Sequence, residues 1–88
     1  MLKDLGELEE ARDLLEKALA SDQQSFEPGH PSIAISQSNL AMVLKDLGEL
    51  EEARKLIQSA FNIFLDKFGE NHHYTVISKE NLDSIMGY

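Results

Sequence analysis

The sequence predicts an all-α protein in which antiparallel helical hairpins stack side by side. The stretch LKDLGELEEAR occupies residues 2–12 and recurs unchanged 42 residues later, at 44–54. An internal period of roughly 20–50 residues is typical of stacked-repeat proteins. Within each unit the apolar residues recur at steps of three or four, which is the spacing of a helix. No segment alternates with the two-residue period of a strand.

The repeat divides a single domain, residues 1–88, into four main helices and an N-terminal helical stub. The expected segments are the end of a truncated first helix at 1–5, a long helix at 8–26, one complete hairpin at 31–68 and a capping helix at 73–86. Pro31 suits the first turn of a helix, and Gly48 and Gly69 suit helix ends. The turn Asp-Leu-Gly-Glu-Leu occurs in both copies, so we expect an equal rotation per unit and a superhelical stack.

Charge and composition exclude several classes of function. The formal net charge is -8, from 16 acids and 8 bases, and nucleic-acid backbones require clustered Lys and Arg instead. We therefore expect neutral or basic protein partners, with ordinary surface solvation as the alternative. No run approaches the roughly 18 apolar residues of a membrane span. The absence of cysteine excludes disulfides and fits a cytoplasmic protein.

Three histidines, His30, His72 and His73, raise the question of a metal site. Stacking would separate His30 from His72 by roughly 10 Å, the packing distance of neighbouring helices, whereas zinc needs nitrogens at about 2.0–2.1 Å. Adjacent His72 and His73 lack the spacing that places two rings on one helix face. Capping of the linkers is therefore the favoured role. Because neither a phosphate loop nor a nucleophile elbow occurs, we expect no cofactor and no catalysis.

Several residues follow the spacing of a known repeat: Asn39-Leu40-Ala41, Leu44, Gly48, Leu50, Glu52-Ala53 and Ala60. This pattern resembles the tetratricopeptide repeat (TPR) family. The period of 42 residues and the Gly-His-Pro or Asn-His-His linkers are similar to the kinesin-light-chain type. The resemblance implies a right-handed superhelix that acts as a non-catalytic protein-protein interaction scaffold.

The resemblance also implies a concave groove, lined by the first helix of each hairpin, that holds an extended peptide or a partner helix. The expected peptide-binding residues are Ile35, Ser38, Asn39, Met42, Lys45 and Asp46, with the later counterparts Ile77, Glu80, Asn81, Ser84, Gly87 and Tyr88. An asparagine amide both donates and accepts, so Asn39 and Asn81 can bind a peptide backbone. The alternative is that each amide bonds a neighbouring helix turn. A carboxylate clamp is not expected, because Ser38 and Met42 stand where that subfamily needs Lys and Asn.

Self-association is the competing interpretation. The first long helix lacks most of its hairpin mate, which leaves one side of an apolar stripe uncovered: Leu8, Ala11, Leu15, Ala18 and Leu19. We expect a homodimer through this open N-terminal end, with exchange of helices as one route. Phe61, Ile63, Phe64 and Leu65 add apolar surface that predicts either a second contact or burial under the last helix. At the other end Asp83 replaces Ala41, which suggests a polar cap. A further alternative is a piece of a longer repeat array.

Overall fold

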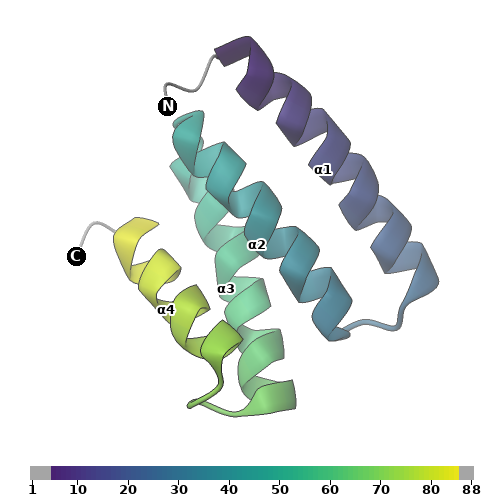
Figure 1. The fold of residues 1–88 in the computed structure, drawn as a ribbon, viewed down its shortest axis with the longest axis vertical. Helices are drawn as coiled ribbons and strands as arrows, with labels where there is room; N and C mark the ends of the chain where they lie inside the picture. The colour runs from purple at the N-terminus through teal and green to yellow at the C-terminus, as the bar shows by residue number, and fades with distance from the viewer. Residues whose placement is uncertain (1–4, 86–88) are drawn as a thin grey trace.

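The computed structural model describes residues 5–85, and this part of the chain forms four antiparallel helices (Figure 1). They are α1 (Leu5–Ser25), α2 (Pro31–Asp46), α3 (Leu50–Phe68) and α4 (His73–Ile85). α2 packs against α1 and α3, and α3 packs against α2 and α4. No strand occurs in residues 5–85, so the all-α prediction is confirmed. The right hand of the superhelix stays a prediction.

The centre of the core lies where α2 and α3 cross. Four alanines there are 0% exposed: Ala34, Ala41, Ala53 and Ala60. Their small side chains let the two helices approach closely, while Leu44 and Ile57 fill the space between them. Leu19 of α1 closes this core on one side, and Leu82 of α4 closes it on the other. The stacking of neighbours thus buries one continuous apolar interior.

The turn between α2 and α3 is fixed by backbone hydrogen bonds. Gly48 adopts φ 86°, in the left-handed region that favours glycine. The Gly48 N–H donates to the Lys45 carbonyl at 3.0 Å, and the Glu49 N–H donates to the Leu44 carbonyl at 2.9 Å. This pair of bonds defines a Schellman motif, which satisfies the last carbonyls of α2. The predicted helix end at Gly48 is therefore confirmed.

The first copy of the same stretch does not form this turn. The structure places both Leu5 and Gly6 inside α1, so the predicted repetition of the turn is wrong. Packing of α2 on α3 holds the turn in the second copy. Continuing a helix through glycine costs only about 1 kcal/mol, so Gly6 can lie within α1. The rest of the predicted stub, residues 1–4, lies outside the described residues, as does the predicted helix end at Met86.

The two linkers that lead into α2 and α4 are built alike. His30 Nδ1 accepts a hydrogen bond of 3.0 Å from the Ser32 N–H, and His72 Nδ1 accepts one of 3.1 Å from the Tyr74 N–H. Each imidazole stacks on the phenylalanine four residues before it, with ring centroids 4.3 Å apart. The histidines therefore satisfy helix N-terminal donors, and the predicted capping role is confirmed.

Candidate functional site

A hollow of about 200 Å³ opens between α2 and α4. From α2 it is lined by Ile35, Ser38, Asn39 and Met42. These residues recur at steps of three or four and therefore share one face of the helix. All four belong to the set predicted to bind peptide. We call this hollow the α2–α4 groove.

The opposite wall of the groove comes from α4. Its lining residues are Tyr74, Ile77, Ser78 and Asn81. Of these, Asn81 was predicted as a binding residue and Ile77 as the counterpart of Ile35. Tyr74 and Ser78 were missed, because the family pattern assigns them no role. The available signal was the helical spacing of Tyr74, Ile77 and Asn81, which places them on one face.

Asn39 and Asn81 present free amides to the groove. They occupy equivalent positions in the two copies, and no hydrogen bond joins either side chain to another described residue. The described residues thus offer no bond to a neighbouring helix turn for either asparagine. Ser38 Oγ, a buried atom of another lining residue, has no hydrogen-bond partner among the described residues either. Polar groups of this kind ordinarily find a partner.

The floor of the groove is aromatic. Phe64 of α3 is 2% exposed, and its ring centroid lies 5.3 Å from that of Tyr74 in α4. Burial under the last helix, one of the two alternatives for the apolar surface of α3, is therefore confirmed for Phe64. Leu65 is not buried in this way and remains 40% exposed, and a second contact for it stays a prediction. The aromatic contact fixes the distance between the floor and the α4 wall.

The other predicted binding residues lie at the end of the groove or away from it. Lys45 Nζ donates a hydrogen bond of 2.9 Å to Ser84 Oγ, which joins α2 to α4. Asp46 is exposed at the last position of α2. Glu80 lines a different hollow, between α3 and α4. The counterparts Gly87 and Tyr88 lie outside the described residues, and the binding roles of the whole set stay predictions.

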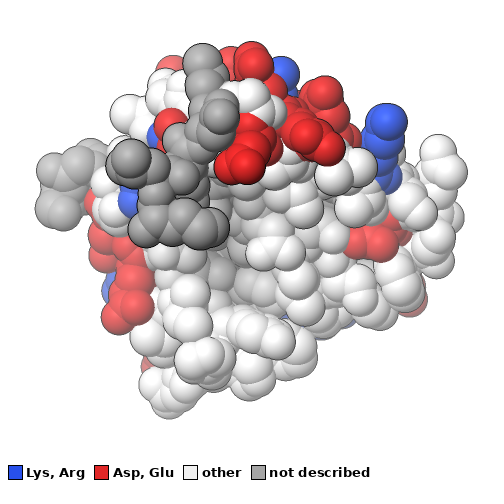
Figure 2. All heavy atoms as spheres, turned by 45° about the horizontal axis from the view of Figure 1, so that its top comes forward, with Lys and Arg blue, Asp and Glu red and all other residues white. Residues whose placement is uncertain are grey.

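The groove itself is uncharged. None of the side chains that line it is acidic or basic. Figure 2 shows a broad uncharged surface with acidic side chains gathered above it and to its left. The net charge of -8 therefore acts on a ligand from the surroundings and not from the groove lining. Apolar and amide contacts are what the groove walls can provide.

The α1 residues predicted for self-association divide between two faces. Leu15 packs against the core and Leu19 is buried within it, whereas Ala18 is exposed, and Leu8 and Ala11 are half-buried. Leu14, which the prediction left out, is 60% exposed. The α1 residues left partly or fully uncovered therefore form a stripe of half-buried Ala11 and exposed Leu14 and Ala18. We call it the α1 stripe.

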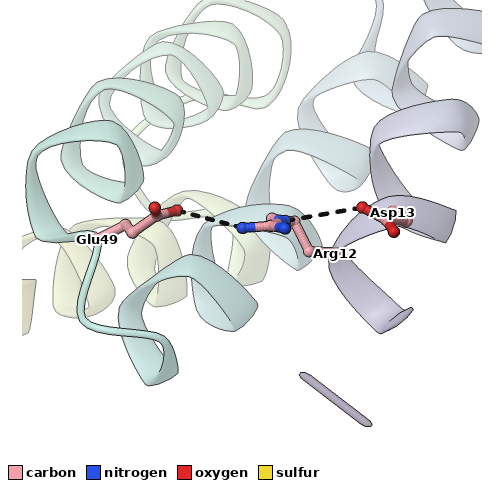
Figure 3. Close-up of polar contacts among 3 residues, drawn as sticks. All are labelled: Arg12, Asp13 and Glu49. Carbon is pink, nitrogen blue, oxygen red and sulfur yellow. Dashed lines mark ion pairs between the residues drawn. The ribbon is translucent and has the colours of Figure 1, made fainter. Parts of the chain in front are cut away.

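An ion-pair bridge ties α1 to the turn that precedes α3. Arg12 lies between two carboxylates, with Nη1 3.8 Å from Glu49 Oε2 and Nε 3.8 Å from Asp13 Oδ1 (Figure 3). The equivalent Arg54 instead donates a hydrogen bond of 2.9 Å to Glu51, which holds the pKa of that carboxyl below its ordinary value. Identical residues in the two copies thus have different partners.

The described residues meet the requirements of neither a metal site nor a membrane span. Within residues 5–85 no cluster of three or more His, Asp or Glu could hold a metal ion. No helix in the same range is both long and apolar enough to cross a membrane. The expectation that the protein is not an enzyme stays a prediction.

The fold and the groove define a class, the stacked helical-hairpin repeat proteins. A family model for the tetratricopeptide repeat matches the chain twice, at residues 1–66 and 32–82. The two matches span nearly the whole sequence, and the chain belongs to the tetratricopeptide repeat family. Membership indicates a module for protein-protein interaction. No curated protein matches the chain significantly. The kinesin-light-chain type stays a prediction.

Proposed function

We propose that this protein is a non-catalytic scaffold that binds an extended segment of a partner protein in the α2–α4 groove. The observation that carries the proposal is the pair Asn39 and Asn81, two unpaired amides at equivalent positions over an apolar floor. Each amide can donate to a peptide carbonyl and accept from a peptide N–H. Such contacts hold a backbone whatever its side chains are.

Selectivity would come from the apolar walls. Ile35 and Ile77 are 39% and 38% exposed, so each has apolar surface left to bury against a ligand side chain. Met42 adds a flexible contact that adapts to different shapes. Basic residues outside the bound segment would speed association through the acidic surroundings, an effect that added salt weakens. The expected cytoplasmic location stays a prediction.

The test is a double substitution, Asn39→Ala with Asn81→Ala. A ligand is first selected from a displayed library of random peptides, and its affinity is then measured by fluorescence anisotropy. Losing even one hydrogen bond of about 0.5–1.5 kcal/mol per asparagine should weaken binding by at least about 1–3 kcal/mol, roughly 5- to 150-fold. Asn62→Ala is the matched control, because Asn62 is exposed on α3 and bonds only Gln58. Unchanged affinity in a folded double variant would show that the two asparagines, and with them the α2–α4 groove, are not the peptide-binding site.

Self-association is a second candidate, favoured by the exposure of the α1 stripe. In α3 the equivalents of Ala11 and Ala18 are Ala53 and Ala60, which are 0% exposed. Pairing of two α1 stripes would cover the same kind of surface in a homodimer. The helix of a preceding repeat would cover it in a longer array.

Light scattering distinguishes these outcomes. A dimer at micromolar concentration that Leu14→Lys converts to a monomer supports self-association. Leu50→Lys is the matched control, since Leu50 is also exposed, at 49%, but lies on α3. A monomeric unmodified chain would eliminate the homodimer.

A further inference from the structure

A second hollow, of about 440 Å³, lies between α3 and α4 and involves a face of α4 that the groove does not use. Leu65 of α3 and Thr75, Val76, Lys79 and Asp83 of α4 contribute to its lining. Of these, none lines the α2–α4 groove. We call it the α3–α4 hollow.

The internal repeat shows what fills such a hollow. One period earlier, Val76 and Asp83 correspond to Ala34 and Ala41 of α2. Both alanines are 0% exposed in the contact with α3, whereas Val76 is 42% exposed. α4 therefore presents the face on which α2 receives a helix, and no described helix covers it. The shape of the site is that of a helix-binding surface.

The chemistry of the lining specifies the kind of helix. Val76 and the 40%-exposed Leu65 offer apolar surface for a stripe of small apolar residues. The lining is acidic on balance, because it contains three acids, Glu70, Glu80 and Asp83, and one base, Lys79. None of these four charges forms an ion pair with another described residue. A helix that covered Asp83 would have to supply a base, since a buried charge requires a partner.

One buried polar atom points to an occupant as well. Thr75 is 1% exposed and contributes to the lining, and its Oγ1 has no hydrogen-bond partner among the described residues. In the earlier repeat the equivalent residue is the apolar Ile33, which needs none. A donor or acceptor on the occupant would satisfy Thr75, because buried hydroxyls are normally bonded.

A second copy of this chain is the wrong occupant. The helix that a copy could offer is α1, the equivalent of α3, and it carries six acids (Glu7, Glu9, Glu10, Asp13, Glu16 and Asp22) against Arg12 and Lys17. Like charges facing each other oppose such docking. The charge at the hollow thus opposes docking of α1 from a further copy and favours a basic helix.

We propose that the α3–α4 hollow docks an amphipathic helix from a partner protein, with a stripe of small apolar residues and a basic flank. This contact is separate from the peptide contact in the α2–α4 groove. The partner helix would lie on α4 as α3 lies on α2.

The probe is a synthetic peptide with the sequence of α3, Leu50–Phe68, in which Glu51, Glu52 and Asp66 are changed to Lys. The reference peptide is the unaltered α3 sequence. With the full chain, fluorescence anisotropy should give at least tenfold tighter binding for the Lys-substituted peptide. Equal affinities for the two peptides would overturn the proposal.

Three variants of the chain locate the contact. Val76→Asp should lower the affinity for the Lys-substituted peptide at least tenfold. If the peptide were held only by non-specific attraction to an acidic protein, the added carboxylate would raise this affinity instead. Ile77→Asp is the matched control, because Ile77 is 38% exposed on the groove face; it should leave this affinity unchanged and weaken only groove ligands. Asp83→Lys leaves two acids and two bases in the lining and should abolish most of the preference for the Lys-substituted peptide, which keeps the test decisive if Val76→Asp misfolds.

Two further results would overturn the proposal. One is equal weakening by Val76→Asp and Ile77→Asp, with helicity retained. The other is light scattering that shows assembly of the unmodified chain, abolished by Val76→Asp, because the occupant would then be a second copy. Loss of groove binding alone, as measured with the Asn39 and Asn81 variants, leaves this inference intact.

Discussion

One substitution made twice in the duplicated stretch should have opposite effects on stability. Gly48→Ala puts a side chain at φ 86°, where an L-residue loses about 1–2 kcal/mol. No atom lies within 4 Å of the added Cβ, so the cost is that of the backbone alone. Gly6→Ala falls within α1, where alanine is favoured over glycine by up to about 1 kcal/mol. The two variants should therefore differ by about 1–3 kcal/mol.

Urea denaturation followed by far-UV circular dichroism measures this difference. A domain of 88 residues has a total stability of roughly 4–13 kcal/mol, so the shift is readily resolved. Both variants should keep the denaturant slope of the unmodified chain, because neither change alters the surface exposed on unfolding.

The comparison can fail in two ways. If Gly6→Ala destabilises the chain as much as Gly48→Ala, then Gly6 is a turn residue and the extension of α1 through it is incorrect. If Gly48→Ala is neutral, the left-handed conformation does not limit the turn between α2 and α3.

Further predictions concern packing, capping and charge. Phe64→Ala should lower the free energy of unfolding by about 3–5 kcal/mol, measured in urea, and Phe68→Ala by clearly less, because Phe68 is 39% exposed; equal losses would contradict the assigned floor. His30→Ala should cost about 1 kcal/mol through the lost cap, and a loss of helicity outside α2 would argue against a local role. Arg54→Ala should raise the pKa of Glu51, whose lowering comes first from the hydrogen bond to Arg54, as followed by NMR titration. Because that pKa is lowered in the folded state, the pair stabilises the fold at neutral pH and loses this contribution as the pH falls below the ordinary glutamate value.

Local signals made the helix boundaries predictable. The predicted hairpin at 31–68 starts and ends where α2 starts and α3 ends, because Pro31 and Gly69 act through their own backbone preferences. The turn at Gly6 was wrongly predicted for the opposite reason. Its local sequence is that of Gly48, so the residues of the turn do not distinguish the two positions, whereas the packing of α2 on α3 holds the turn at Gly48.

The groove residues show the same contrast between what the local sequence predicts and what contacts between helices decide. Ile35, Asn39 and Asn81 were placed on one surface by repeat alignment, and the structure gathers them in one hollow. Glu80 aligns with Ser38 but lines the other side of α4, since a long charged side chain at the border of two faces extends toward water. Tyr74 could not be found by alignment, because its contact with Phe64 joins two different helices.

Within residues 5–85, extensive packing joins only helices that are consecutive in the sequence. α2 and α4 are the two walls of the groove, and the hydrogen bond from Lys45 to Ser84 joins them. A ligand that contacts both walls would hold α4 against α2, whereas without ligand α4 packs extensively on α3 alone. Ligand at about 100 times its Kd would add about 2.7 kcal/mol to the stability of the bound form. Binding of a segment in the proposed groove would therefore be coupled to the ordering of α4.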